Sequence, residues 1–316
     1  MTDQNRPPAL QLGAALAAAV LVGVLTAVQA RINGALGAAI GDGFLAAAIS
    51  FGSGLALILV ITMSASAGRR GLRLLAAGAG RSIPIWMLLG GLAGAVTVAT
   101  QGFTVATIGV ALFTVGLVAG QTAGGLILDR VGYGPAGVVA VTVPRLVGGL
   151  LAVVGVVLCA LGQRGEPVAW WMLALPVIAG AGIAWQQGTN GRLRQELGSP
   201  LSTTVVNFAG GSIALGIAAA VSVAINGMPT LRAEPWMYLG GVIGVVYIVI
   251  SAALVKRTGV LLLGLGSVVG LLAASIVLDA IAPPPAGPSL FTASVAAAVA
   301  FVGVVIAVVP WRRRAR

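Results

Sequence analysis

The sequence predicts an all-α integral membrane protein of ten transmembrane helices, built as two inverted five-helix repeats. Three observations predict this fold: long apolar runs, an internal repeat, and an uneven distribution of the 18 Lys and Arg residues. The chain is 59% hydrophobic and 8% charged, whereas soluble domains carry roughly 25% charged residues. Too few charged residues are therefore present to cover a water-facing surface.

Ten apolar runs separated by turn-forming Gly, Pro and Asp residues are each expected to cross the bilayer, which takes about 20 residues per helix. The runs are 10–30, 44–63, 84–100, 104–128, 145–161, 170–187, 201–225, 235–255, 259–278 and 290–309. The first run also resembles a cleavable signal peptide. The same unit recurs near residue 180, however, and this favours a permanent first helix.

The two halves of the chain share sequence, which predicts a first repeat over 1–161, a second over 170–316 and a connecting loop over 162–169. With a shift of 150 residues, 17 of the 46 positions in 84–129 are identical to those in 234–279. A shift of 157 residues aligns the other matched positions: Gly23, Gln29, Asn33, Gly34, Leu36, Gly41, Phe51 and Gly54 with Gly180, Gln186, Asn190, Gly191, Leu193, Gly198, Phe208 and Gly211.

The basic residues predict that the second repeat is inverted, because five helices per repeat is an odd number. If the N-terminus is cytoplasmic, 15 Lys and Arg residues fall on the cytoplasmic side and 3 on the outer side, as the positive-inside rule requires. Arg192 and Arg194 also replace Ala35 and Gly37 at equivalent positions. The cations thus occur in the copy that faces the cytoplasm.

Composition argues against several classes of function. The net charge of +11 is accounted for by membrane orientation, so we expect no nucleic-acid partner. The chain has no histidine, and its one cysteine, Cys159, lies in an apolar run. We therefore expect no metal site, no cofactor and no catalytic residues, and the absence of a phosphate-binding GxxxxGK[ST] loop argues against nucleotide hydrolysis.

Two amide pairs are the main candidates for a substrate pathway. Gln29 with Asn33, and Gln186 with Asn190, are each spaced i, i+4, so both amides of a pair lie on one helix face. They either line a polar path or cap frayed carbonyls before the glycines that follow them and link to a neighbouring helix. Further candidates for the pathway are Asn207 (equivalent to Ser50), Gln121 and Trp185.

Glycines spaced four apart predict close helix packing. These are Gly90, Gly94, Gly116, Gly120, Gly240, Gly244, Gly266 and Gly270. None of the seven acids lies mid-helix; Asp129 and Asp279 close the fourth and ninth helices and are the nearest candidates for a proton site. Capping, or a bond to Arg130, is the preferred interpretation of Asp129. Arg31 is expected to reach the outer interface.

The motif Gln-x-x-x-Asn-Gly-x-Leu, followed by [Ser/Asn]-Phe-x-x-Gly, occurs at 29–54 and again at 186–211. Together with the Gly-x-x-Gly of the third helix and the Leu-Asp that ends the fourth and ninth, it resembles the DMT_YdcZ (DUF606) family of the drug/metabolite transporter superfamily. The tenth helix and the Pro-rich sequence after Asp279 depart from this pattern. The resemblance implies a bacterial inner-membrane protein with both termini in the cytoplasm. It also implies a central cavity lined by Gln29, Asn33, Gln121, Gln186 and Asn190.

These observations predict a secondary transporter, most simply an exporter, that moves a small organic solute by alternating access. The alternative is a non-catalytic channel or an accessory membrane subunit. A path lined by amides, hydroxyls and glycines suits a neutral or weakly polar solute. The expected partners are this small-molecule substrate and the lipid bilayer, and the sequence leaves open whether the protein is a monomer or a homodimer.

Overall fold

The structure, a computed structural model, describes residues 9–79, 83–134, 137–164 and 168–308. The side chains of residues 9–12, 78–79, 252–253, 255–262 and 308 lie outside the described part, as do the arginines expected near both chain ends. Every regular element in the described part is helical, and an isolated bridge joins Gln163 to Pro288. The predicted all-α class is confirmed.

The helices follow one another along the chain with short connections. They are α1 (Ala9–Ile40), α2 (Gly43–Ser64), α3 (Ser66–Leu74), the π-helical turn η1 (Leu75–Ala79), α5 (Ile85–Leu88), α6 (Gly90–Arg130), α7 (Val143–Leu161), α8 (Trp170–Leu197), α9 (Pro200–Asn226), the 3₁₀ turn η2 (Pro235–Leu239), α10 (Gly240–Ile281) and α11 (Leu290–Val308). Asp42 caps α2 by accepting a hydrogen bond from the Leu45 amide at 2.9 Å.

Seven helices among the described residues are long and apolar enough to cross a membrane. They are Gly13–Ile40, Gly43–Ser64, Ile85–Arg130, Val143–Leu161, Pro200–Asn226, Leu263–Ile281 and Leu290–Ala307. Pro235–Ser251 is a shorter apolar helix. Large apolar side chains such as Leu150, Ile213 and Ile217 are more than half exposed, which suits a surface in contact with lipid.

Two long helices replace pairs of shorter ones. α6 joins the third and fourth apolar runs, and its 41 residues form two helical parts that meet at Gly109. It is broken at Gly109, whose φ of 85° and ψ of 166° are accessible to glycine but strained for other residues. α10 likewise joins the eighth and ninth runs. The expected helix ends near residues 100 and 255 were therefore wrong.

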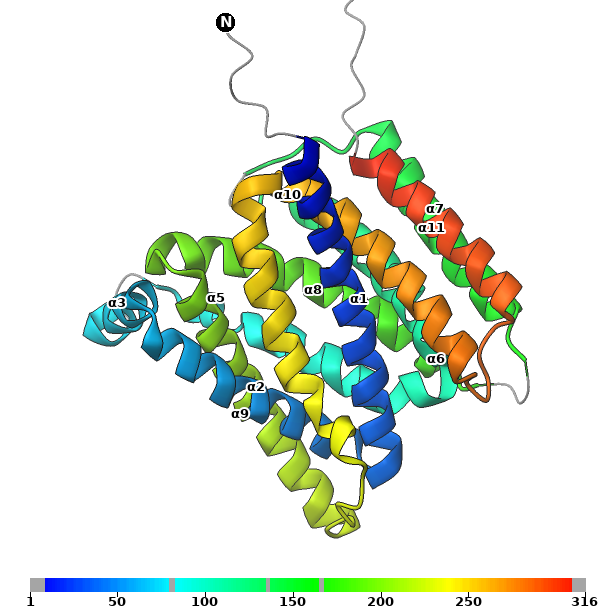
Figure 1. The fold of residues 1–316 in the computed structure, drawn as a ribbon, viewed down its shortest axis with the longest axis horizontal. Coiled ribbons are helices and arrows are strands. Elements are labelled where there is room, and N and C mark those ends of the chain that lie inside the picture. Colours follow the sequence, from blue (N-terminus) through cyan, green and yellow to red (C-terminus); the bar gives the residue numbers. More distant parts are fainter. Residues whose placement is uncertain (1–8, 80–82, 135–136, 165–167, 309–316) are drawn as a thin grey trace, which may run out of the picture.

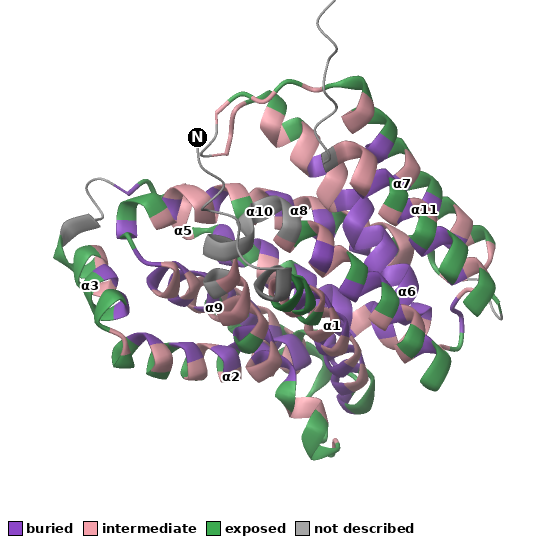
Figure 2. Ribbon diagram, turned by 45° about the horizontal axis from the view of Figure 1, so that its top comes forward, coloured by how far each residue is buried: buried purple, intermediate pink, exposed green. Residues whose placement is uncertain are grey.

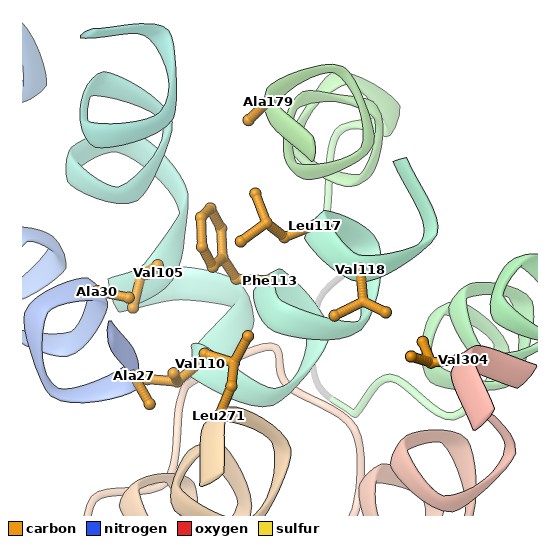
Figure 3. Close-up of a cluster of buried hydrophobic side chains, with 10 residues drawn as sticks. All are labelled: Ala27, Ala30, Val105, Val110, Phe113, Leu117, Val118, Ala179, Leu271 and Val304. Atoms are coloured by element: carbon orange, nitrogen blue, oxygen red, sulfur yellow. The ribbon is translucent and has the colours of Figure 1, made fainter. Parts of the chain in front are cut away.

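The long helices form the centre of the molecule (Figure 1). α1 packs mainly against α10, α6 mainly against α8, and α7 pairs with α11 along one edge. The middle of α6 is buried almost continuously (Figure 2). Around it, Phe113 and Leu117 of α6 contact a core that includes Ala27 and Ala30 of α1 and Ala179 of α8 (Figure 3).

Glycines bring these helices into backbone contact. A Cβ on Gly120 of α6 would overlap the carbonyl oxygen of Val177 of α8, and a Cβ on Gly270 of α10 would overlap that of Val20 of α1. Gly116 and Gly266 similarly face Pro176 and Ala19. Each α10–α1 contact involves residues shifted by 150 and 157 positions from its α6–α8 counterpart. The same packing detail therefore occurs twice in the molecule.

Candidate substrate pathway

The first polar cluster lies where α8 and α9 meet the start of α6; we call it the α6-start cluster, and it consists of Gln186, Asn190 and Asn207. The Asn207 amide donates to Asn190 Oδ1 at 2.7 Å and to the Thr203 carbonyl at 2.9 Å. Gln186 Nε2 donates to Asn207 Oδ1 at 3.1 Å. Asn207 is buried, whereas Gln186 and Asn190 are half-buried. The three amides thus form one connected network.

The second polar cluster lies where α1 and α2 meet the start of α10; we call it the α10-start cluster, and it consists of Gln29, Asn33, Ser50 and Gln101. Gln29 Nε2 donates to the Gly240 carbonyl at 3.0 Å, and Asn33 Nδ2 donates to Gln101 Oε1 at 2.7 Å. All four side chains are buried. Gln101, which sequence reasoning missed, belongs to this cluster through α6.

Four of the glycines predicted to pack helices make room for these amides. A Cβ on Gly90 would lie 2.9 Å from Asn190 Oδ1 and 3.0 Å from Asn207 Oδ1, and one on Gly94 would lie 3.0 Å from Gln186 Nε2. In the α10-start cluster, Cβ atoms on Gly240 and Gly244 would overlap the amides of Asn33 and Gln29. The starts of α6 and α10 therefore approach the amides closely because they carry no side chains there.

The amides do not sit at helix ends. α1 continues past Gly34 to Ile40, and α8 continues past Gly191 to Leu197. Because the carbonyls before these glycines lie within a helix, they are not frayed. Gln29 donates a hydrogen bond to a carbonyl of another helix. This agrees with the expected link to a neighbouring helix, and it argues against a cap on carbonyls of its own helix.

Trp185 and Gln121 are placed differently from the amide pairs. Trp185 lies on α8 and Gln121 on α6, where the backbone of Gln121 faces Gly180. Both side chains are half-buried, and neither makes a hydrogen bond to an amide cluster among the described residues. The structure therefore does not join them to either cluster.

An arginine between two aromatic rings lies beside the α6-start cluster. The Arg192 guanidinium carbon is 5.7 Å from the Trp86 ring centroid and 5.6 Å from that of Tyr133, distances typical of cation–π contacts. Arg192 also donates to the Gly132 carbonyl at 3.0 Å, and the hydroxyls of Tyr133 and Thr189 are 3.0 Å apart. Trp86 is thus a packing partner of a cation.

Beside this arginine is an open hollow of about 290 Å³. It is lined by Met87, Gly134, Gly137, Arg192, Gln195 and Glu196. Arg192 lies one helical turn or less from Thr189 and Asn190. The hollow therefore lies beside the part of α8 that carries Asn190.

The two carboxylates that end the fourth and ninth apolar runs have distinct partners. Asp279 is buried and accepts from the amides of Val110 at 2.9 Å and Ala111 at 2.7 Å, directly after the break at Gly109. It thus caps the second part of α6. Asp129 forms an ion pair with Arg145 at the start of α7, rather than with the adjacent Arg130.

Residues 14–158 and 171–308 match the family model DMT_YdcZ, described as "Putative inner membrane exporter, YdcZ". The chain belongs to the DMT_YdcZ family. The suspected resemblance is confirmed over nearly the whole sequence, and the DMT_YdcZ description together with the apolar helices identifies a multi-pass inner-membrane protein of an exporter family. No curated protein matches the chain.

Proposed function

We propose that this DMT_YdcZ protein is a secondary transporter that exports a small, neutral or weakly polar organic solute by alternating access. The observation that carries the proposal is the pair of uncharged polar clusters, each at the start of a long central helix and each involving equivalent amides. Uncharged amides solvate polar groups inside a membrane without the desolvation penalty of an ion. The protein acts without a cofactor and is not an enzyme.

The architecture we propose has ten membrane spans in two inverted halves. In it, Ile85–Arg130 crosses twice, and α8 and Pro235–Ser251 contribute the two spans that are shorter or less apolar. The two matched family segments, 14–158 and 171–308, fall one in each half. The recurrence of the α6–α8 glycine contacts between α10 and α1 supports the same division.

We place both chain ends in the cytoplasm. The start of α1 and the end of α11 lie at the same end of the molecule (Figure 1), and the majority of the cations fall on that side in this orientation. The α6-start cluster then lies toward the inner face and the α10-start cluster toward the outer face. Two equivalent polar clusters at different depths are an arrangement that alternating access by inverted repeats can use.

Transport is tested with the purified full-length protein in proteoliposomes loaded with a small-molecule extract of bacterial cytosol. We expect saturable, time-dependent loss of particular compounds, followed by mass spectrometry. Asn190→Ala should reduce the rate at least about tenfold, since it removes a hydrogen-bonding amide from the path. Asn226→Ala, at the exposed end of α9, is the matched control and should leave the rate unchanged.

A non-catalytic channel is the alternative function. A channel would conduct in planar bilayers without saturation, and its solute would show no counterflow in proteoliposomes. Non-saturable conductance by the wild-type protein would therefore refute the transporter proposal. Equal rates for Asn190→Ala and the wild type would remove this amide from the proposed path.

A further inference from the structure

The two polar clusters differ at the equivalent positions Ser50 and Asn207. In the α6-start cluster, the Asn207 amide supplies the hydrogen bond that Asn190 Oδ1 accepts. In the α10-start cluster, the equivalent acceptor is Asn33 Oδ1, and the side chain that would supply its donor is the shorter Ser50. In the α6-start cluster, the Asn oxygen therefore accepts a hydrogen bond from a side chain of the cluster itself. The α10-start cluster has no amide at the position that would supply this bond.

The result is a pair of buried oxygens without a protein partner. Among the described residues, neither Asn33 Oδ1 nor Ser50 Oγ has a hydrogen-bond partner, although Asn33 is fully buried and Ser50 is 3% exposed. Both face Gly240: a Cβ there would overlap Asn33 Oδ1 and would lie 3.0 Å from Ser50 Oγ. One O–H or N–H group placed between them could reach both oxygens.

We propose that this oxygen pair receives a hydrogen-bond donor of the transported solute, a hydroxyl or amide group. The proposal rests on the transport function proposed above and assigns the solute-binding contact to the α10-start cluster. Its side chains, Gln29, Asn33, Ser50 and Gln101, are all uncharged, so the donor belongs to a neutral group. A buried acceptor without a donor is unfavourable, and a solute that supplies the donor gains the corresponding affinity.

Contacts between α1 and α6 close the outer side of the α10-start cluster. Between the cluster and the outer end of α1, a Cβ on Gly34 would lie 2.7 Å from Val105 Cβ, and one on Gly37 would overlap the Gly102 carbonyl. α1 and α6 are therefore in backbone contact on that side. The oxygen pair becomes accessible from the outer side when these two helices separate.

The decisive variant is Ser50→Asn, which copies the amide found at Asn207 into the α10-start cluster. We expect the unliganded variant to melt about 2–4 °C higher than the wild type, because Asn33 Oδ1 gains a donor. We expect its export of donor-bearing compounds from the loaded proteoliposomes to fall at least about tenfold. Greater stability together with lost export is the opposite of what damage to the fold would produce.

A second variant adds no volume and keeps the test decisive if Ser50→Asn fails to fold. Ser50→Ala removes one of the two oxygens and should raise the KM of the exported compound about tenfold with little change in maximal rate. Ser53→Ala is the matched control, because the Ser53 hydroxyl donates to the Ser50 carbonyl of its own helix at 3.0 Å. Its KM should equal that of the wild type.

Two outcomes would overturn the proposal: unaltered KM in Ser50→Ala, which would mean that the oxygens hold only a fixed water, or a stable Ser50→Asn that exports normally. If the wild type exports nothing, the transport function itself fails. Thermal shifts with fractions of the same extract then decide the site separately. A fraction that stabilises the wild type but not Ser50→Ala supports it, and the absence of such a fraction refutes it.

Discussion

Asp279 stabilises the break in α6 at Gly109 through two hydrogen bonds. Its two carboxylate oxygens each accept one backbone amide, from Val110 and Ala111, where Gly109 interrupts α6. A charged acceptor at a helix start is favourable because it satisfies free N–H groups and interacts with the helix dipole. This carboxylate therefore has a structural role in the described conformation.

Asp279→Asn should lower the free energy of unfolding by about 1–3 kcal/mol. An amide offers one acceptor oxygen where the carboxylate offers two, so one of the N–H groups loses its partner. Thermal unfolding in detergent measures the effect. Glu234→Gln, an exposed carboxylate whose side chain makes no capping bond, is the control and should be neutral. An unchanged melting temperature for Asp279→Asn would show that the charge is not needed for the cap.

For single residues, the sequence predicted which polar side chains lie inside the helices better than it predicted their hydrogen-bond partners. The amide pairs were recognised because polar side chains are unfavourable inside apolar runs. Gln101 was missed because it falls between the third and fourth runs, where a loop was expected. The bonds from Asp279 to Val110 and Ala111 join residues 168 or more positions apart, and nothing local in the sequence encodes such a pairing.

Among the elements, α6 and α8 approach each other closely along a row of glycines. Gly120 meets the Val177 carbonyl, and Gly124 meets Ala181. In a membrane, such close approach provides dispersion contacts in place of the hydrophobic effect. The strength of this pairing should therefore depend on the missing Cβ atoms.

Gly120→Ala should destabilise the protein by about 1–3 kcal/mol, since the added methyl overlaps the Val177 carbonyl and forces the helices apart. Gly125→Ala, five residues along the same helix and facing open space, should be neutral or stabilising by up to about 1 kcal/mol. Equal effects of the two substitutions would refute the packing role.

The equivalent contact offers an independent comparison. Gly270→Ala should behave like Gly120→Ala, because its Cβ would overlap the Val20 carbonyl. Gly264→Ala, which meets nothing within 4 Å, should behave like Gly125→Ala. A loss of stability in Gly264→Ala comparable to that in Gly270→Ala would contradict this prediction. Thermal unfolding under the same conditions measures all four variants.

The sequence predicted the existence of the helices well and their ends poorly. Apolar runs identify segments that can sit in a bilayer, but a helix continues beyond its apolar part wherever its backbone groups find partners. α1 therefore extends to Ile40, and α6 runs through 101–103 because Gly102 packs against Gly43 of α2. The short helix α3 was not expected, because its arginines suggested a loop.

At the scale of the whole molecule, the proposed inversion has a direct test. Ala38 and Gln195 are equivalent under the 157-residue shift, and both are exposed. In a background with Cys159→Ala, Ala38→Cys should react with a membrane-impermeant maleimide on intact cells. Gln195→Cys should react only after the membrane is permeabilised.

The two sites form a matched pair because they are equivalent under the repeat and both are exposed. Gly37 itself is unsuitable for labelling, since a side chain there would overlap the Gly102 carbonyl. Labelling of Ala38→Cys and Gln195→Cys from the same side would rule out the inverted arrangement.

The pairing of α1 with α10 has a consequence for synthesis of the protein. The bond from Gln29 to Gly240 spans 211 residues, so at ribosomal speeds of about 5–20 residues per second α1 waits roughly 10–40 s for its partner. α8, by contrast, follows α6 closely along the chain. During that delay the amides of α1 need hydrogen-bond partners in the insertion machinery. A nascent chain stalled before residue 240 should therefore form a crosslink from position 29 to that machinery.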